Sequence, residues 1–396
     1  MATATDTPIP LWLDCDPGHD DAFAILLAAH HPSLNLLGIT TIHGNASLEN
    51  TTINATRVLE AIGRPEVPVY PGTKKPFCRP AVHAPNIHGQ LPTEHAHLMR
   101  QAYLAIMDTG SSGIDGTELL PKASRPPITD KNPILGMRDA LMAQPKGTPW
   151  VIATGTLTNI ALLFATFPEV AAHIKGLSIM GGGVGDGFAN APISRLVGHE
   201  KRVGNVTPLA EFNIYCDPES SQSIFSNEIL ASKTFLMTLD LTHQVVASRD
   251  VQTRILHGDG DPSRPPTVLR QILYELLLFF ASTYEAEFGL TTGPPLHDPL
   301  AVAAIISTLN PDFASRYPEQ TLKFDDRNGE RFAVTVVTDG LHGTDIAMVG
   351  QLGRSVVSSH PTGVTIPRGV DVEAFWNIIL NCIRRADELN AARTAA

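Results

Sequence analysis

The sequence predicts an α/β fold with a mostly parallel open sheet covered by helices on both faces. Short, almost wholly apolar segments alternate with longer amphipathic ones, as expected when buried parallel strands are joined by helices. Polar clusters follow several of the apolar segments, where ligands gather in such sheets. The chain has 396 residues, 43% of them hydrophobic, which is enough for one large core. We therefore expect a single domain spanning residues 1–396.

The predicted strands are short apolar runs, each ended by polar or turn-forming residues. They cover residues 11–13, 35–41, 67–70, 150–153, 176–180 and 234–239. The helices are predicted from apolar positions recurring at helical spacing, as at Phe23, Leu26 and Leu27. They cover residues 20–30, 48–62, 157–167, 218–226 and 372–389.

Two segments interrupt this alternation. Residues 76–130 are rich in Pro, Gly and His, with a helix-like piece at 97–107, and residues 185–204 are Gly-rich and then basic. Both are too long to be simple connections, so each is interpreted as either a functional lid or a surface loop.

Charge and composition argue against several classes of partner. A net charge of −11 disfavours a nucleic-acid backbone or an anionic membrane, because both repel an acidic protein. The four cysteines form no CxxC pair and are interpreted as reduced thiols. The N-terminus lacks the features of a signal peptide, and the longest apolar run, 276–281, is too short to span a bilayer. We expect a soluble, cytoplasmic protein.

The strongest chemical signal is a group of four carboxylates in one strand-to-helix turn: Asp14, Asp16, Asp20 and Asp21. Like charges this close need compensation, and a hard divalent cation such as calcium supplies it through oxygen ligands. The spacing is not that of an EF-hand. Helix capping would account for Asp20 and Asp21 but not for Asp14 and Asp16 as well.

The turn Asp14-Cys15-Asp16-Pro17-Gly18-His19-Asp20-Asp21-Ala22 resembles the N-terminal fingerprint of the inosine-uridine preferring nucleoside hydrolase family. The resemblance continues in the family's order through residues 40–45, 87–89, 153–161, 180–183, 205–213, 240–244 and 297–299. It implies a calcium-dependent enzyme that cleaves the N-glycosidic bond of ribonucleosides, giving ribose and free base. Its partner is thus a small nucleoside, and we expect a homodimer or homotetramer.

The resemblance also implies roles for individual residues. Calcium is expected to bind the carboxylates of Asp16, Asp21 and Asp298 and the main-chain carbonyl of Thr154. Asp16 is expected to be the general base, and Asp20 to accept a hydrogen bond from the ribose 2′-hydroxyl. The other residues expected to contact the metal shell or the sugar are Asn45, Met180, Asn205, Glu211 and Asn213, with the Asn213 carbonyl near the developing cation.

Two histidines are predicted to serve the nucleobase. His297 adjoins the ligand Asp298 and would protonate the leaving base, while His88 resembles a second base-pocket residue. The family's other strategy, a purine held between tryptophans, is disfavoured because Trp12, Trp150 and Trp376 are all interpreted as core residues. The chain departs from the family pattern at 90–111 and 188–203, which look like insertions bordering the pocket mouth.

Three other interpretations compete with this one. The run from Met180 to Gly185 suggests a dinucleotide-binding turn, but no helix is predicted to start there. A phosphohydrolase with an Asp-x-Asp motif lacks the Pro17–Asp21 continuation. A catalytically impaired homologue that only binds nucleosides is the remaining alternative.

Overall fold

The computed structural model describes residues 7–82, 112–189, 191–258, 263–343 and 346–395. His88, the predicted helix at 97–107 and the insertion at 90–111 lie outside the described residues. The central sheet has six parallel strands in the order β3-β2-β1-β4-β5-β6. Their bounds are β1 Ile9–Cys15, β2 Leu34–Thr41, β3 Val69–Pro71, β4 Trp150–Ala153, β5 Gly176–Met180 and β6 Thr234–Met237.

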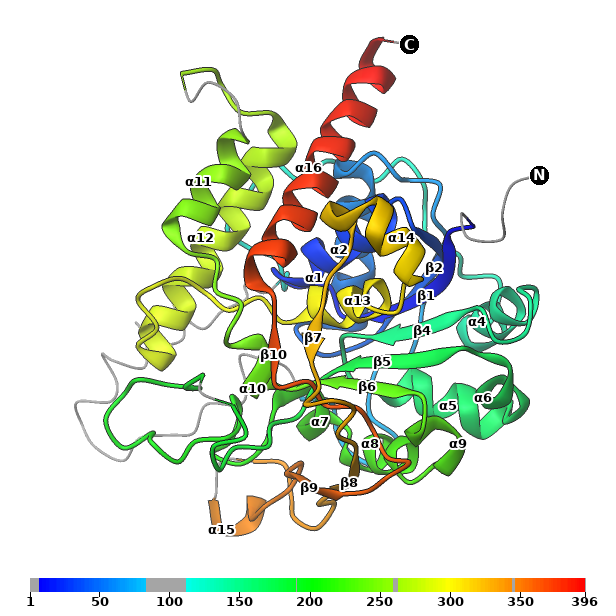
Figure 1. Cartoon of the computed structure of the whole chain (residues 1–396), viewed down its shortest axis with the longest axis vertical. Coiled ribbons are helices and arrows are strands. Elements are labelled where there is room, and N and C mark those ends of the chain that lie inside the picture. Colours follow the sequence, from blue (N-terminus) through cyan, green and yellow to red (C-terminus); the bar gives the residue numbers. More distant parts are fainter. Residues whose placement is uncertain (1–6, 83–111, 190, 259–262, 344–345, 396) are drawn as a thin grey trace.

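Side chains alternate between the two faces of the sheet along each strand, and in these strands the residues on both faces are apolar. In β1, Leu11 and Leu13 pack into one hydrophobic cluster, whereas Trp12 packs into another on the opposite face. The first cluster is covered by α1 (Asp21–His30), α2 (Leu48–Ala61), α12 (Val268–Phe288), α13 (Asp298–Ile306) and α16 (Val372–Ala395). The second is covered by α4 (Pro133–Met142), α5 (Thr158–Thr166), α6 (Glu169–His173) and α8 (Pro218–Phe225). The predicted fold class is confirmed, with helices above and below the sheet (Figure 1).

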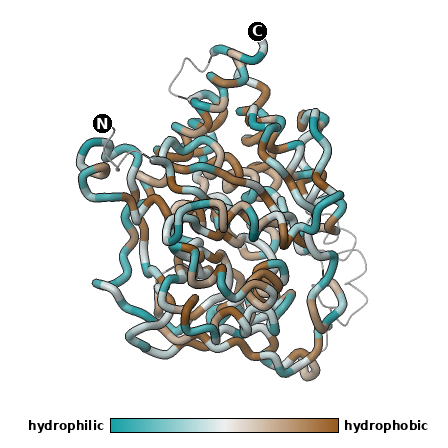
Figure 2. The backbone as a smooth tube through the Cα atoms, turned by 90° about the vertical axis from the view of Figure 1, so that its right-hand side faces the viewer, coloured by the Kyte–Doolittle hydropathy of each residue, from teal (hydrophilic) through white to brown (hydrophobic). Residues whose placement is uncertain are grey.

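Apolar segments run through the interior, and the peripheral loops are largely hydrophilic (Figure 2). Trp12, Trp150 and Trp376 are all buried in the two clusters, as predicted. None of the helices formed by the described residues is long and apolar enough to cross a membrane.

The smaller elements were not predicted from the sequence. Two antiparallel pairs lie outside the central sheet: β8 (Phe332–Val336) with β9 (Ser355–Ser359), and β7 (Phe324–Asp325) with β10 (Gly369–Val370). Sequence analysis also missed α4 and the 21-residue α12. The remaining helices in the described residues are α7 Phe212–Cys216, α9 Glu228–Ala231, α10 Leu239–Thr242, α11 Arg249–His257, α14 Pro311–Arg316, α15 Ile346–Val349 and a 3₁₀ turn, Pro318–Gln320.

Candidate active site

The candidate site lies where the carboxyl ends of the parallel strands meet. Asp16 follows β1, Asn45 lies beyond β2, Thr154 follows β4 and Met180 ends β5. The backbone N–H of Gly18 donates to Asp21 Oδ2 at 2.9 Å, which closes the turn between β1 and α1. The topology therefore gathers residues that are far apart in the sequence.

Three buried carboxylates face one point. Asp20, Asp21 and Asp298 each offer an oxygen, and these oxygens lie within 4.8 Å of one another. The backbone N–H groups of His297 and Asp298 donate to Asp20 Oδ2 at 3.2 and 3.4 Å, so the start of α13 is held against the start of α1. The hydroxyl of Thr154 donates to Asp21 Oδ1 at 2.9 Å.

Asp16 lies beside this group and is fully buried. Its Oδ2 accepts the backbone N–H of Asn45 at 2.7 Å, while Oδ1 has no hydrogen-bond partner among the described residues. A Cβ added to Gly155 would lie 2.5 Å from that Oδ1, so only glycine permits this approach. The Asn45 amide braces the turn by donating to the Asp16 carbonyl at 3.1 Å and to Asp21 Oδ2 at 3.3 Å.

Burial and mutual repulsion raise the pKa values of these carboxylates. Burial, followed by the charge of Asp21, raises the pKa of Asp16 well above its usual value. Burial and the neighbouring Asp20 and Asp21 raise the pKa of Asp298 in the same way. A divalent cation would relieve both the burial cost and the repulsion. The orphaned Asp16 oxygen and the all-oxygen donor set therefore fit a hard ion such as calcium.

Asp14 lies behind the cluster. Its Oδ1 accepts hydrogen bonds from the Thr40 hydroxyl and, at 2.8 Å, from the Asn159 amide. Burial raises the pKa of Asp14 to about 7. This carboxyl group links β1, β2 and α5 below the candidate metal ligands.

Asn213 is oriented by two strand ends. Its Nδ2 donates to the carbonyls of Thr154 at 2.8 Å and Met180 at 3.3 Å. Because the amide is planar, these bonds turn its Oδ1 in another direction. Glu211, which precedes it, is buried and accepts the backbone N–H groups of Gly182, Asn213 and Ile214. Glu211 therefore caps α7 and holds it against the glycine turn that follows β5.

His297 is buried, and both of its ring nitrogens are engaged. Nδ1 pairs with the Thr242 hydroxyl at 2.7 Å, and Nε2 pairs with the Tyr284 hydroxyl at 2.6 Å. Burial, and then the neighbouring His243, hold the pKa of His297 well below its usual value. The imidazole is consequently neutral near pH 7, with one nitrogen carrying a proton.

Tyr284 is a site residue that sequence analysis missed. It is buried on α12, and its pKa is raised well above the usual value by burial and by the charges of Asp20 and Asp298. Its hydroxyl also hydrogen-bonds the side chain of Asn205, whose Oδ1 accepts the backbone N–H of Phe212 at 2.9 Å. No motif marks Tyr284, which is one of two tyrosines in a helix that also carries polar and charged residues.

Comparison with known protein families finds a match over most of the chain. Residues 11–377 match the family model described as inosine-uridine preferring nucleoside hydrolase. The chain belongs to this nucleoside hydrolase family. The resemblance predicted from the motifs is confirmed, and with it the prediction that the protein is an enzyme, a nucleoside N-ribosyl hydrolase.

Individual nucleoside hydrolases match over almost their full lengths. The uridine nucleosidase of Saccharomyces cerevisiae is 33% identical over 388 residues, covering 98% of this chain and 99% of the relative. The pyrimidine-specific ribonucleoside hydrolase RihB of Escherichia coli is 30% identical, covering 94% of this chain and 96% of the relative. A plant nucleoside hydrolase has the same fold, with a TM-score of 0.67 at 23% identity, covering 95% of this chain and 99% of its own.

Proposed function

We propose that this enzyme hydrolyses the N-glycosidic bond of ribonucleosides in a calcium-dependent reaction, giving ribose and free base. The observation that carries the proposal is the buried group of Asp20, Asp21 and Asp298 next to the unpartnered Oδ1 of Asp16. Four buried carboxylates this close need a cation, and the end of a parallel sheet is where a small ligand binds.

In this proposal Asp16, Asp21, Asp298 and the Thr154 carbonyl hold the calcium ion. The Thr154 carbonyl has a second lone pair besides the one that accepts the Asn213 amide, so it remains a suitable ligand. When bound, such an ion lowers the pKa of water and binds neighbouring hydroxyls. Asp16 takes the proton of the attacking water at its Oδ1.

The sugar is held by groups around this point. Asp20 accepts the 2′-hydroxyl, and Asn213 presents its Oδ1 towards the positive charge that develops on the ribose. Asn45, Met180, Asn205 and Glu211 complete the sugar pocket. Support comes from the hydrogen bonds that fix Asn213 through its Nδ2.

Leaving-group protonation is assigned to Tyr284 and His297 together. The Tyr284 hydroxyl passes its proton to the departing base, and the Nε2–H of the neutral His297 stabilises the phenolate that forms by a hydrogen bond until the phenolate regains a proton from solvent. In this tautomer the Thr242 hydroxyl donates to Nδ1 at 2.7 Å. His88 stays a proposed base-pocket residue.

Uridine is the substrate we expect first, because the relatives above are named for uridine and for pyrimidine ribonucleosides. The proposal includes a cytoplasmic homodimer or homotetramer, and light scattering on a size-exclusion column measures the assembly directly.

The deciding experiment is steady-state kinetics on uridine, cytidine, inosine and adenosine, with the protein as purified, after chelation, and after calcium is restored. We expect uridine to be cleaved, the chelated protein to be inactive, and calcium to restore turnover. Binding of uridine without release of uracil would instead establish the impaired, binding-only alternative. Activity that survives complete removal of calcium would exclude the metal assignment.

A further inference from the structure

The two proposed ribose residues Glu211 and Asn213 are positioned by a helix that cannot be stable alone. Helix α7, Phe212–Cys216, has only five residues. An isolated helical turn this short does not form in water, since nucleation costs more than one turn returns. The position of α7, and thus of Asn213, therefore depends on the contacts that other segments make with this helix.

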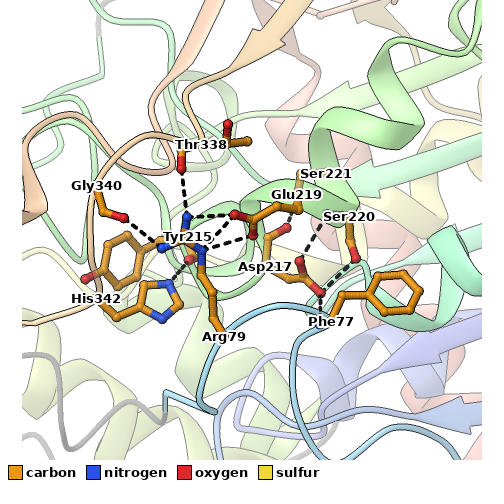
Figure 3. Close-up of polar contacts among 10 residues, drawn as sticks. All are labelled: Phe77, Arg79, Tyr215, Asp217, Glu219, Ser220, Ser221, Thr338, Gly340 and His342. Atoms are coloured by element: carbon orange, nitrogen blue, oxygen red, sulfur yellow. Dashed lines mark hydrogen bonds and ion pairs between the residues drawn. The ribbon is translucent and has the colours of Figure 1, made fainter.

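The first set of contacts joins Tyr215 of α7 to the loop after β8. His342 Nε2 donates to the Tyr215 carbonyl at 2.7 Å, and the two rings lie 4.6 Å apart (Figure 3). The backbone N–H of Gly343 donates to the Tyr215 hydroxyl at 3.3 Å. A Cβ on Gly353 would lie 2.7 Å from Tyr215 Cα, so the polypeptide approaches α7 closely there.

The second set of contacts is made by Asp217, which lies between α7 and α8. Its Oδ2 accepts the backbone N–H of Phe77 at 3.1 Å and the hydroxyls of Thr158 and Ser220 at 2.6 and 2.7 Å. Its Oδ1 accepts the backbone N–H of Ser220 at 3.0 Å. Asp217 thereby joins the segment after β3 to the end of α7.

Arg79 connects these two sets of contacts. Its side chain is 12% exposed, and its Nε and Nη2 bind both oxygens of Glu219 on α8 at 2.7–3.0 Å. Its Nη2 also donates to the Thr338 carbonyl at 2.7 Å, and Nη1 donates to the Gly340 carbonyl at 2.9 Å. One guanidinium thus ties together the segment after β3, the first turn of α8 and the loop that carries His342 (Figure 3).

We propose that Arg79 is a positioning residue for the ribose pocket, acting through Glu219 and the 338–343 loop on α7. The inference rests on the proposed function, because it takes Asn213 and Glu211 as sugar ligands. Arg79 itself contacts neither of them. Losing its fork of donors would let α7 shift, and displacements of about 1 Å at positioning groups weaken substrate use up to about a hundredfold. Lysine cannot replace it, since an ammonium lacks the planar fork.

The test compares Arg79→Ala and Arg79→Lys with Arg384→Ala, which removes an exposed arginine paired with Glu388 on α16. We expect KM to rise about tenfold for uridine and for p-nitrophenyl riboside alike in both Arg79 variants, with kcat changed less, because the sugar is common to both substrates. The calcium concentration that gives half-maximal activity should stay unchanged, and so should all constants of Arg384→Ala.

A purely structural role predicts a different result. In that case the melting temperature falls but KM of the folded protein stays within about twofold of the parent, and that result overturns the inference. If Arg79→Ala does not fold, Glu219→Gln applies the same test, since it keeps the shape of the side chain and removes the charge that Arg79 binds. If the parent protein cleaves no nucleoside, the proposed function fails separately. Calorimetric binding of ribose to parent and variant then decides the positioning role.

Discussion

Replacing Tyr284 with Phe tests leaving-group activation most directly. The change removes one hydroxyl, 2.6 Å from His297 Nε2, and leaves the aromatic packing on α12 in place. Losing a general acid lowers kcat about 10²–10⁴-fold, which corresponds to about 3–5 kcal/mol in the activation barrier. His297→Ala should lower kcat for uridine by a similar factor. It should also destabilise the fold, because the buried Thr242 hydroxyl loses its His297 partner, at about 1–3 kcal/mol, and the Tyr284 hydroxyl keeps only Asn205.

The assay compares uridine with p-nitrophenyl riboside, whose leaving group departs without a proton. We expect both variants to lose turnover of uridine and to keep most of their turnover of p-nitrophenyl riboside. Tyr70→Phe, which removes the hydroxyl of a buried tyrosine in β3, is the matched control and should leave both rates unchanged. Equal losses on both substrates would mean that Tyr284 and His297 shape the pocket or the metal site. No loss for Tyr284→Phe would return the acid role to His297 alone, to His88 or to solvent.

Three further predictions concern the sugar, the metal and acid stability. If Asp20 accepts the 2′-hydroxyl, 2′-deoxyuridine should be hydrolysed far more slowly than uridine, because the deoxy sugar leaves the buried Asp20 carboxylate without that partner; similar kcat/KM values would refute that contact. Gly155→Ala places a Cβ 2.5 Å from Asp16 Oδ1 and should weaken both calcium binding and turnover, while Gly369→Ala, where the added Cβ meets only ordinary contacts, should not; a calcium titration followed by activity measures this. Burial lowers the pKa of His31 from 6.5 to about 4, so the unfolded chain binds its proton more readily between these values and the fold loses stability as the pH falls through this range. His31→Gln should flatten the dependence of melting temperature on pH there, and an unchanged slope would contradict this reasoning.

The sheet was predictable because its strands are apolar on both faces and each ends in a polar cluster. All six predicted strands are found, with β3 shifted from 67–70 to Val69–Pro71. The two small antiparallel pairs were missed because they are short and lie outside the alternation of strands and helices; β7 and β10 have two residues each, and β8 and β9 have five each. Helix α12 was missed because its apolar run, 276–281, was considered only as a possible membrane span, although Thr267 caps its N-terminus and Gly289 ends it in the left-handed conformation.

The same contrast holds within the candidate site. Asp20, Asp21 and Asp298 come together, with Asp16 beside them, because each lies at an element end marked by a local motif, and the parallel topology brings such ends to one edge. Tyr284 has no such mark. It reaches His297 from the interior of a long helix, by a packing arrangement that spacing along the chain does not encode.

Arg79, which is not proposed to touch the substrate, is likewise not marked by any motif. Motifs record groups whose chemistry requires a fixed spacing, such as the carboxylates after β1. A positioning residue works through the carbonyls of Thr338 and Gly340 and through one carboxylate, and any sequence can supply a carbonyl. Its role therefore becomes visible only when the three segments it joins are seen together. A one-turn helix that carries proposed ligands must be held by such contacts, so substitutions at the residues that support α7 should change sugar binding without altering any group that lines the pocket.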